Sequence, residues 1–268
     1  MIDTAAKQSF RLGALTPEPA LRQRMPLLPG RLRANKSPDS LDRSRIAYSP
    51  IMGLNDQYGD CTAVGIANAA LAKAALGGFR LPITDQQVLA FYARCLGIDP
   101  TNLPALAAAE GAYESDVLVV QAQAGFQTSD DLLVGAFGSL QDPLDFNSIR
   151  MLMVEWGSAY LGVSLSLADQ ACDVWTANPP ASAGDPTPGS WGGHALLAWD
   201  YEGVEDSDIV HLVTWGSCGQ RATWGWLRKA CQEAHGILWR QLGLAALQDS
   251  EYQALLAAGQ QVPMVINA

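Results

Sequence analysis

The chain has 268 residues, of which 49% are hydrophobic and 16% charged, and its formal net charge is −10. This composition is typical of a folded globular protein and excludes a disordered one. No apolar run approaches the ~20 residues that cross a bilayer, and the first residues lack a signal-peptide pattern. We therefore expect no membrane contact and a protein that works where it is made.

Charge is unevenly distributed along the chain. Residues 1–45 carry nine Lys/Arg and four Asp/Glu, whereas the remainder carries eight and twenty-three. We call residues 1–45 the N-terminal arm; its five prolines predict an extended segment held by an acidic surface, on its own body or on a partner or second copy. The acidic body should repel nucleic acid, so no nucleic-acid partner is expected.

The body, residues 46–268, reads as helices first and strands later. Helices are predicted over 61–76, 84–95, 114–124, 144–157, 224–240 and 248–258, and strands over 159–165, 194–200 and 209–215. This order favours an α+β fold. We expect a mainly helical lobe over 46–150, a mainly β lobe over 151–240 and a helical tail over 241–268.

The cysteines and histidines do not suggest a metal centre. The five cysteines are scattered and no Cys-x-x-Cys occurs, so neither a zinc cluster nor another cofactor is expected. Four of the cysteines are predicted to be unpaired and inert: Cys95, Cys172, Cys218 and Cys231. His211 and His235 are expected to be ordinary core or surface histidines, His235 on the helix over 224–240.

Two short segments carry the candidate chemistry. Leu54-Asn-Asp-Gln-Tyr-Gly-Asp-Cys61-Thr delivers Cys61 to the first turn of the buried helix over 61–76. The unpaired N–H groups at that end favour a thiolate, so we expect a lowered thiol pKa and a nucleophilic Cys61. Ser190-Trp-Gly-Gly-His194-Ala-Leu-Leu opens an apolar strand with His194, where the two glycines allow close approach of a ligand.

Together with Val213-Thr214-Trp215-Gly216, these segments resemble the papain superfamily, whose members carry Gln-x5-Cys, Gly-His-Ala-Val and Asn-Ser-Trp-Gly in this order. The motifs Asn-Asp-x-x-Gly-Asp-Cys-Thr, Gly-Gly-His-Ala and Thr-Trp-Gly are similar to a compact branch found in bacteria and their phages. The resemblance covers residues 46–240. It implies a papain-like fold with a helical lobe and an antiparallel β lobe.

The resemblance also assigns roles to individual residues. Cys61 matches the nucleophile and His194 the base. Asn55, six residues before the cysteine, matches the glutamine of the oxyanion hole, with Gln57 as a competing donor. The asparagine that orients the imidazole is absent. If the strands of His194 and Trp215 pair around residues 201–208, Thr214 faces His194, and its hydroxyl is the expected replacement.

Two functions from different classes follow. The first is a thiol hydrolase that cleaves a peptide or amide bond, with Cys61, His194, Asn55 and Thr214 as its site. The second is a structural or interaction protein that keeps the fold, such as a phage virion or tail component docking through its arm. The basic arm, the acidic body and the missing asparagine favour the second, because fold alone does not decide function. We nevertheless take the hydrolase as the first expectation. The expected location is accordingly the cytoplasm, or the virion if a phage encodes the chain.

Overall fold

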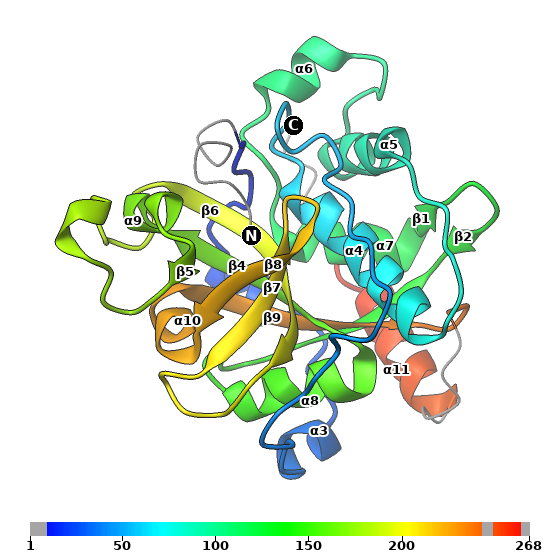
Figure 1. The fold of residues 1–268 in the computed structure, drawn as a ribbon. Helices are drawn as coiled ribbons and strands as arrows, with labels where there is room; N and C mark the ends of the chain where they lie inside the picture. The colour runs from blue at the N-terminus through cyan, green and yellow to red at the C-terminus, as the bar shows by residue number, and fades with distance from the viewer. Residues whose placement is uncertain (1–9, 243–248, 264–268) are drawn as a thin grey trace.

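The computed structural model describes residues 10–242 and 249–263, which form helices packed on both faces of one large sheet (Figure 1). The helices are α2 (Pro19–Arg22), α3 (Gly30–Ala34), α4 (Cys61–Leu76), α5 (Asp85–Leu96), α6 (Leu103–Ala108), α7 (Glu114–Ala124), α8 (Phe146–Trp156), α9 (Leu167–Ala171), α10 (Trp224–Ala230) and α11 (Asp249–Gln260). The strands are β1 (Phe126–Gln127), β2 (Leu132–Leu133), β3 (Gly135–Ser139), β4 (Ala159–Leu165), β5 (Val174–Trp175), β6 (Gly192–Tyr201), β7 (Ile209–Thr214), β8 (Ser217–Thr223) and β9 (Cys231–Trp239).

Seven of the strands form a mixed sheet in the order β3-β9-β4-β6-β7-β8-β5, in which only β5 and β8 pair in parallel. One hydrophobic core lies between this sheet and helices α4, α5 and α7, and a second lies under α8 and α10. The α+β fold class is confirmed. The helical and β parts are not cleanly separate along the chain, because β3 comes from the predicted helical lobe and pairs with β9.

The best predicted helices are those with clear end signals. Helix α4 begins at Cys61 and is buried on nearly every side, as its alanine-rich sequence indicates. Helix α5 begins after Thr84, whose hydroxyl accepts from the Gln87 backbone N–H while the Gln87 side chain accepts from Thr84 N–H. This capping box satisfies backbone donors that would otherwise be unpaired at the helix start.

The helix predicted over 224–240 is wrong beyond its first turns. Helix α10 ends at Ala230, and residues 231–239 form β9, which lies between β3 and β4. Residues such as Gln232, Glu233 and Ala234 favour a helix locally, but a central strand buried on both faces overrides that preference. Strand β8, between Trp215 and α10, was not anticipated either.

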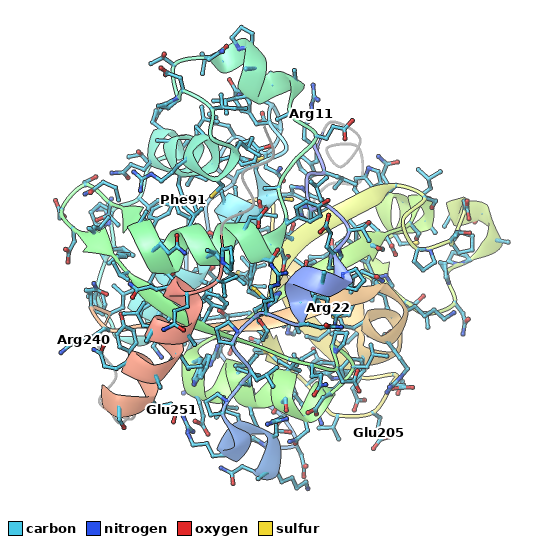
Figure 2. All side chains as sticks on the ribbon, turned by 180° about the vertical axis from the view of Figure 1, so that it is seen from behind. Arg11, Arg22, Phe91, Glu205, Arg240 and Glu251 are labelled. Carbon is cyan, nitrogen blue, oxygen red and sulfur yellow. The ribbon has the colours of Figure 1, made fainter. Side chains whose placement is uncertain are left out.

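Residues 10–45 of the N-terminal arm lie along the chain's own body. The arm adds isolated backbone bridges at Ala14, Leu27 and Leu41, and it contains the two short helices α2 and α3. Leu28 and Leu32 are buried in the second core. Arg31 pairs with Glu155 of α8 and with Glu251 of α11, the latter labelled in Figure 2. Docking therefore depends on apolar burial and backbone hydrogen bonds as much as on charge.

Arg43 anchors the end of the arm. Its side chain is buried, lies over the Trp199 ring, and donates to the backbone carbonyls of Met153, Gly157 and Trp199. Burial lowers the pKa of this guanidinium to about 10. The three carbonyls share one donor group, so its loss would remove a hydrogen bond from each of them.

We predict that Arg43→Met lowers the free energy of unfolding by about 3 kcal/mol, because buried acceptors without donors cost about 1–3 kcal/mol each and part of the packing is retained. The matched control is Arg45→Met, since Arg45 is exposed two residues away; it should change stability by less than about 0.5 kcal/mol. Urea unfolding followed by tryptophan fluorescence measures both variants. Equal midpoints for the two would show that Arg43 does not anchor the arm.

Candidate active site

The first turn of α4, which begins at Cys61, lies against the start of β6, which contains His194. Helix α4 packs against β6, and the backbone N–H of Ala195, the residue after His194, lies near the Cys61 sulfur and favours its thiolate form. Both Cys61 and His194 are 1% exposed. No hydrogen bond joins the thiol to the imidazole in the described residues, and the buried His194 Nδ1 has no partner.

Thr214 holds the other side of the imidazole. Its Oγ1 lies 2.6 Å from His194 Nε2. The pairing of β6 with β7 places Val213 opposite Leu197, with a bulge between Ala198 and Asp200. Thr214 is therefore a diagonal neighbour of His194 and not the residue directly opposite, as the assumed hairpin register predicted. An offset of two residues keeps both side chains on one face of the sheet, so the contact forms nonetheless.

Trp215 covers the imidazole from the end of β7. Trp215 and Gly216 are the two loop residues of the β7–β8 hairpin, because Thr214 pairs with Ser217, and both have positive φ (46° and 71°). Such two-residue turns favour Asn or Gly, so a tryptophan here is strained. The strain places the indole on His194, with ring centroids 4.5 Å apart and planes 20° from parallel.

Asn55 lies in the loop before α4 and is buried. Its side-chain amide donates to the Tyr58 backbone carbonyl (3.2 Å), and its backbone carbonyl accepts from the Arg11 backbone N–H (2.9 Å). Gln57, the competing donor, is exposed. The amide of Asn55 is thus used within its own loop in this form and would have to turn to reach a substrate oxygen.

Residues 10–15 of the arm cover the site. Ala14 N–H donates to the Gly193 carbonyl (3.2 Å), Ala112 N–H donates to the Gly13 carbonyl (2.9 Å), and Leu15 N–H donates to the Ala112 carbonyl (3.1 Å). This segment therefore runs parallel to the chain at Ala112. This contact was not predicted from the sequence; its signal is the uncharged, apolar stretch from Leu12 to Leu15 inside an otherwise basic arm.

The approach of the arm is so close that it needs glycine. A Cβ on Gly13 would lie 2.0 Å from the Gly59 carbonyl oxygen, and one on Gly193 would lie 2.0 Å from the Ala14 carbonyl oxygen. The backbone N–H of Gly13 lies near the Cys61 sulfur and favours its thiolate form. The Cys61 sulfur therefore lies next to the backbone of the arm.

Burial under the arm reverses the expected ionisation of the pair. It raises the pKa of the Cys61 thiol to about 12, despite the N–H groups of Ala195 and Gly13, and it lowers the pKa of His194 to about 3. The lowered thiol pKa expected from the helix N-terminus is therefore wrong for this form. Both groups are neutral here because neither charge is solvated.

Comparisons with known proteins identify the architecture. The solved structures that resemble this chain include procathepsin L2 from Tenebrio molitor larval midgut (TM-score 0.60, 14% identity, covering 89% of this chain and 81% of that one). They also include xylellain, a cysteine protease from Xylella fastidiosa (0.59, 14%, 86% and 96%), and procathepsin B S9 from Trypanosoma congolense (0.60, 13%, 89% and 89%). The fold is papain-like.

No family model and no curated protein sequence matches the chain. At 14% identity or less, the likeness concerns the papain-like fold and not the individual residues of the site. The thiols of Cys95, Cys218 and Cys231 are free in the structure. Within the described residues, no helix is long and apolar enough to span a membrane.

Proposed function

We propose that the protein is a papain-like thiol hydrolase that cleaves peptide or amide bonds, with Cys61 as nucleophile and His194 as base. The observation that carries this proposal is the state of the imidazole. Thr214 engages Nε2, while Nδ1 has no partner, in a site where the Cys61 sulfur contacts the neighbouring residue of the same strand. A ring held at one nitrogen with the other free is suited to proton transfer.

In the proposed reaction, His194 takes the Cys61 proton as the sulfur attacks the substrate carbonyl carbon. The carbonyl oxygen becomes an oxyanion, which the Cys61 backbone N–H and the Asn55 amide would bind. The imidazolium then gives its proton to the leaving amine as the carbon–nitrogen bond breaks. Water, deprotonated by His194, hydrolyses the thioester and restores the thiol. Thr214 keeps the imidazole oriented throughout. No cofactor enters these steps.

We further propose that residues 10–15 of the arm act as a gate. They fill the position a substrate would need, they present an N–H to the sulfur, and they keep both catalytic groups neutral. A substrate can enter only after this segment leaves. The closed form is accordingly expected to be inactive.

The alternative, a virion or tail protein docking through its arm, loses its main support. It required the arm to reach outward, whereas residues 10–45 lie on the chain's own body. We also propose, from sequence patterns alone, that the chain belongs to the compact bacterial and phage-borne branch. A protein partner or second copy at the arm is a proposal on the same basis.

The test uses a truncated protein that begins at Glu18, since the core residues of the arm start at Met25. We predict that it hydrolyses members of a fluorogenic peptide-amide library, that the full chain does so much more slowly, and that truncated Cys61→Ala is inactive. Truncated protein that stays folded, reacts at Cys61 with a thiol probe and yet cleaves no amide would refute the hydrolase. Equal activity of truncated and full-length protein would refute the gate alone.

A further inference from the structure

Three side chains of metal-binding type, none of them part of the proposed catalytic pair, meet between α7 and β9. Glu114 is the first residue of α7, and Glu233 and His235 alternate along β9, so that both project from one face of that strand. One ligand atom from each of the three lies within 4.8 Å of the other two. The exposed fractions are 0% for Glu114, 3% for Glu233 and 2% for His235.

Glu114 has no hydrogen-bond partner for either carboxylate oxygen. His235 Nε2 lies 3.7 Å from Glu114 Oε2 and 3.2 Å from Glu233 Oε2, so the ring nitrogen contacts both acids but hydrogen-bonds only Glu233. A buried carboxylate without donors is costly, because it has lost its water and gained nothing in exchange. Two carboxylates and one imidazole thus face one another, and neither oxygen of Glu114 has a donor among the described residues.

The imidazole is arranged as metal-binding histidines are. His235 Nδ1 lies 2.7 Å from Ser139 Oγ on β3, which fixes the ring with Nε2 directed at the two carboxylates. Metal-binding histidines commonly engage their second nitrogen in this way, which fixes both tautomer and ring direction.

We propose that Glu114, Glu233 and His235 bind a first-row divalent cation of the Zn²⁺ class. One imidazole and two carboxylates suit such an ion, and three protein ligands leave a position for water. The ion would neutralise Glu114 and tie α7 to β9, that is, the helical layer to the sheet. Burial and the charge of Glu233 raise the pKa of Glu114, so a proton is the competing occupant of the same place.

The test uses the full chain, stripped with a chelator, dialysed, and given one equivalent of Zn²⁺. We expect one Zn²⁺ per chain to survive further dialysis, measured by atomic emission, and a melting temperature several degrees above that of the stripped protein. His235→Gln should weaken Zn²⁺ binding at least about 100-fold. Ser139→Ala, which removes only the orienting hydroxyl, should weaken it about 10-fold or more.

Two variants separate metal binding from general damage. Glu114→Gln should abolish retention of Zn²⁺ without lowering the stability of the stripped protein, since it replaces a protonated carboxyl group by a neutral amide of nearly the same shape. The matched control is His211→Gln, because His211 also contacts two carboxylates, of Asp200 and Glu202, but stands outside the buried cluster. It should retain the ion.

Three results would overturn the site. Absence of retained Zn²⁺, with a melting temperature that does not respond to the ion, would mean that Glu114 and Glu233 share a proton instead. Loss of Zn²⁺ in His211→Gln but not in His235→Gln would place the ion at the surface. An equal response to Ca²⁺, which prefers six to eight oxygen ligands, would exclude the Zn²⁺ class.

Discussion

Removing residues 1–17 should increase the rate at which iodoacetamide modifies Cys61 at pH 7 by about 100-fold. In the closed form the thiol is buried beneath Gly13, and its pKa is about 12. Without the arm segment the sulfur is exposed at a helix N-terminus, and its pKa should fall to that of a free thiol, ~8.5, or lower.

The size of the effect follows from two opposing changes. A fall in pKa from about 12 to ~8.5 increases the thiolate fraction at pH 7 by roughly 3000-fold. A less basic thiolate is also a weaker nucleophile, and its rate constant falls with a Brønsted slope of about 0.4–0.5. The net gain is therefore about 100-fold, before any gain from access. Peptide mass analysis is needed to assign the label, because Cys218 is exposed and Cys172 is half-buried.

A point variant tests the same gate in the full chain. Gly13→Ala places a Cβ 2.0 Å from the Gly59 carbonyl oxygen, so the segment must leave its place over the sulfur. The matched control is Gly30→Ala in α3, where an added Cβ meets nothing within 4 Å. We expect faster labelling of Cys61 only in Gly13→Ala. Unchanged labelling in both the truncated protein and Gly13→Ala would contradict the gate.

Local sequence signals were enough for the parts of the fold that depend on local physics. The start of α4 at Cys61 and the cap of α5 at Thr84 were predicted because end signals and composition act within a few residues. The meeting of Thr214 with His194 was anticipated from strand alternation, although the register was not. The pairing differs from the predicted one by three residues at Tyr201–Val210, and the bulge after Ala198 reduces this difference to two at Leu197–Val213. An even difference keeps Thr214 on the face of His194, which explains why the contact was predicted although the register was not.

Features of the structure that depend on contacts between distant parts of the chain were not predicted. Strand β9 has a helix-favouring sequence and becomes a strand only because β3 and β4 lie on either side of it. Placing His235 on a helix hid its relation to Glu233, since residues two apart share a face on a strand but not on a helix. The position of the arm over Cys61 was not predicted for a similar reason. Tertiary packing brings Gly13 close to Gly59, and the presence of a glycine in the sequence does not indicate what it will contact.

In the truncated protein, His194→Ala should lower the rate of amide hydrolysis at least about 1000-fold, because it removes both the base that deprotonates Cys61 and the acid that protonates the leaving amine. Thr214→Val should lower the rate about 10-fold, since the imidazole loses its hydrogen bond to the Thr214 hydroxyl but keeps the stacked Trp215. Thr214→Ser, which keeps the hydroxyl, is the matched control and should stay near the unsubstituted rate. Initial rates on one fluorogenic amide measure all three.

In the full chain, the pH dependence of Cys61 labelling should reveal the role of His194. The closed form holds a neutral imidazole whose pKa is about 3, against 6.5 when the ring is free. Below pH 6.5 the imidazole takes up a proton in the open form but not in the closed form. Protonation therefore favours the open form, and the closed form loses stability as pH falls. The rate at which Cys61 is labelled in the full chain should therefore approach the rate in the truncated protein as pH falls from 6.5 to about 4. In His194→Ala the two rates should not converge. A pH-independent ratio in the unsubstituted chain, together with hydrolysis that survives His194→Ala, would remove His194 from the site.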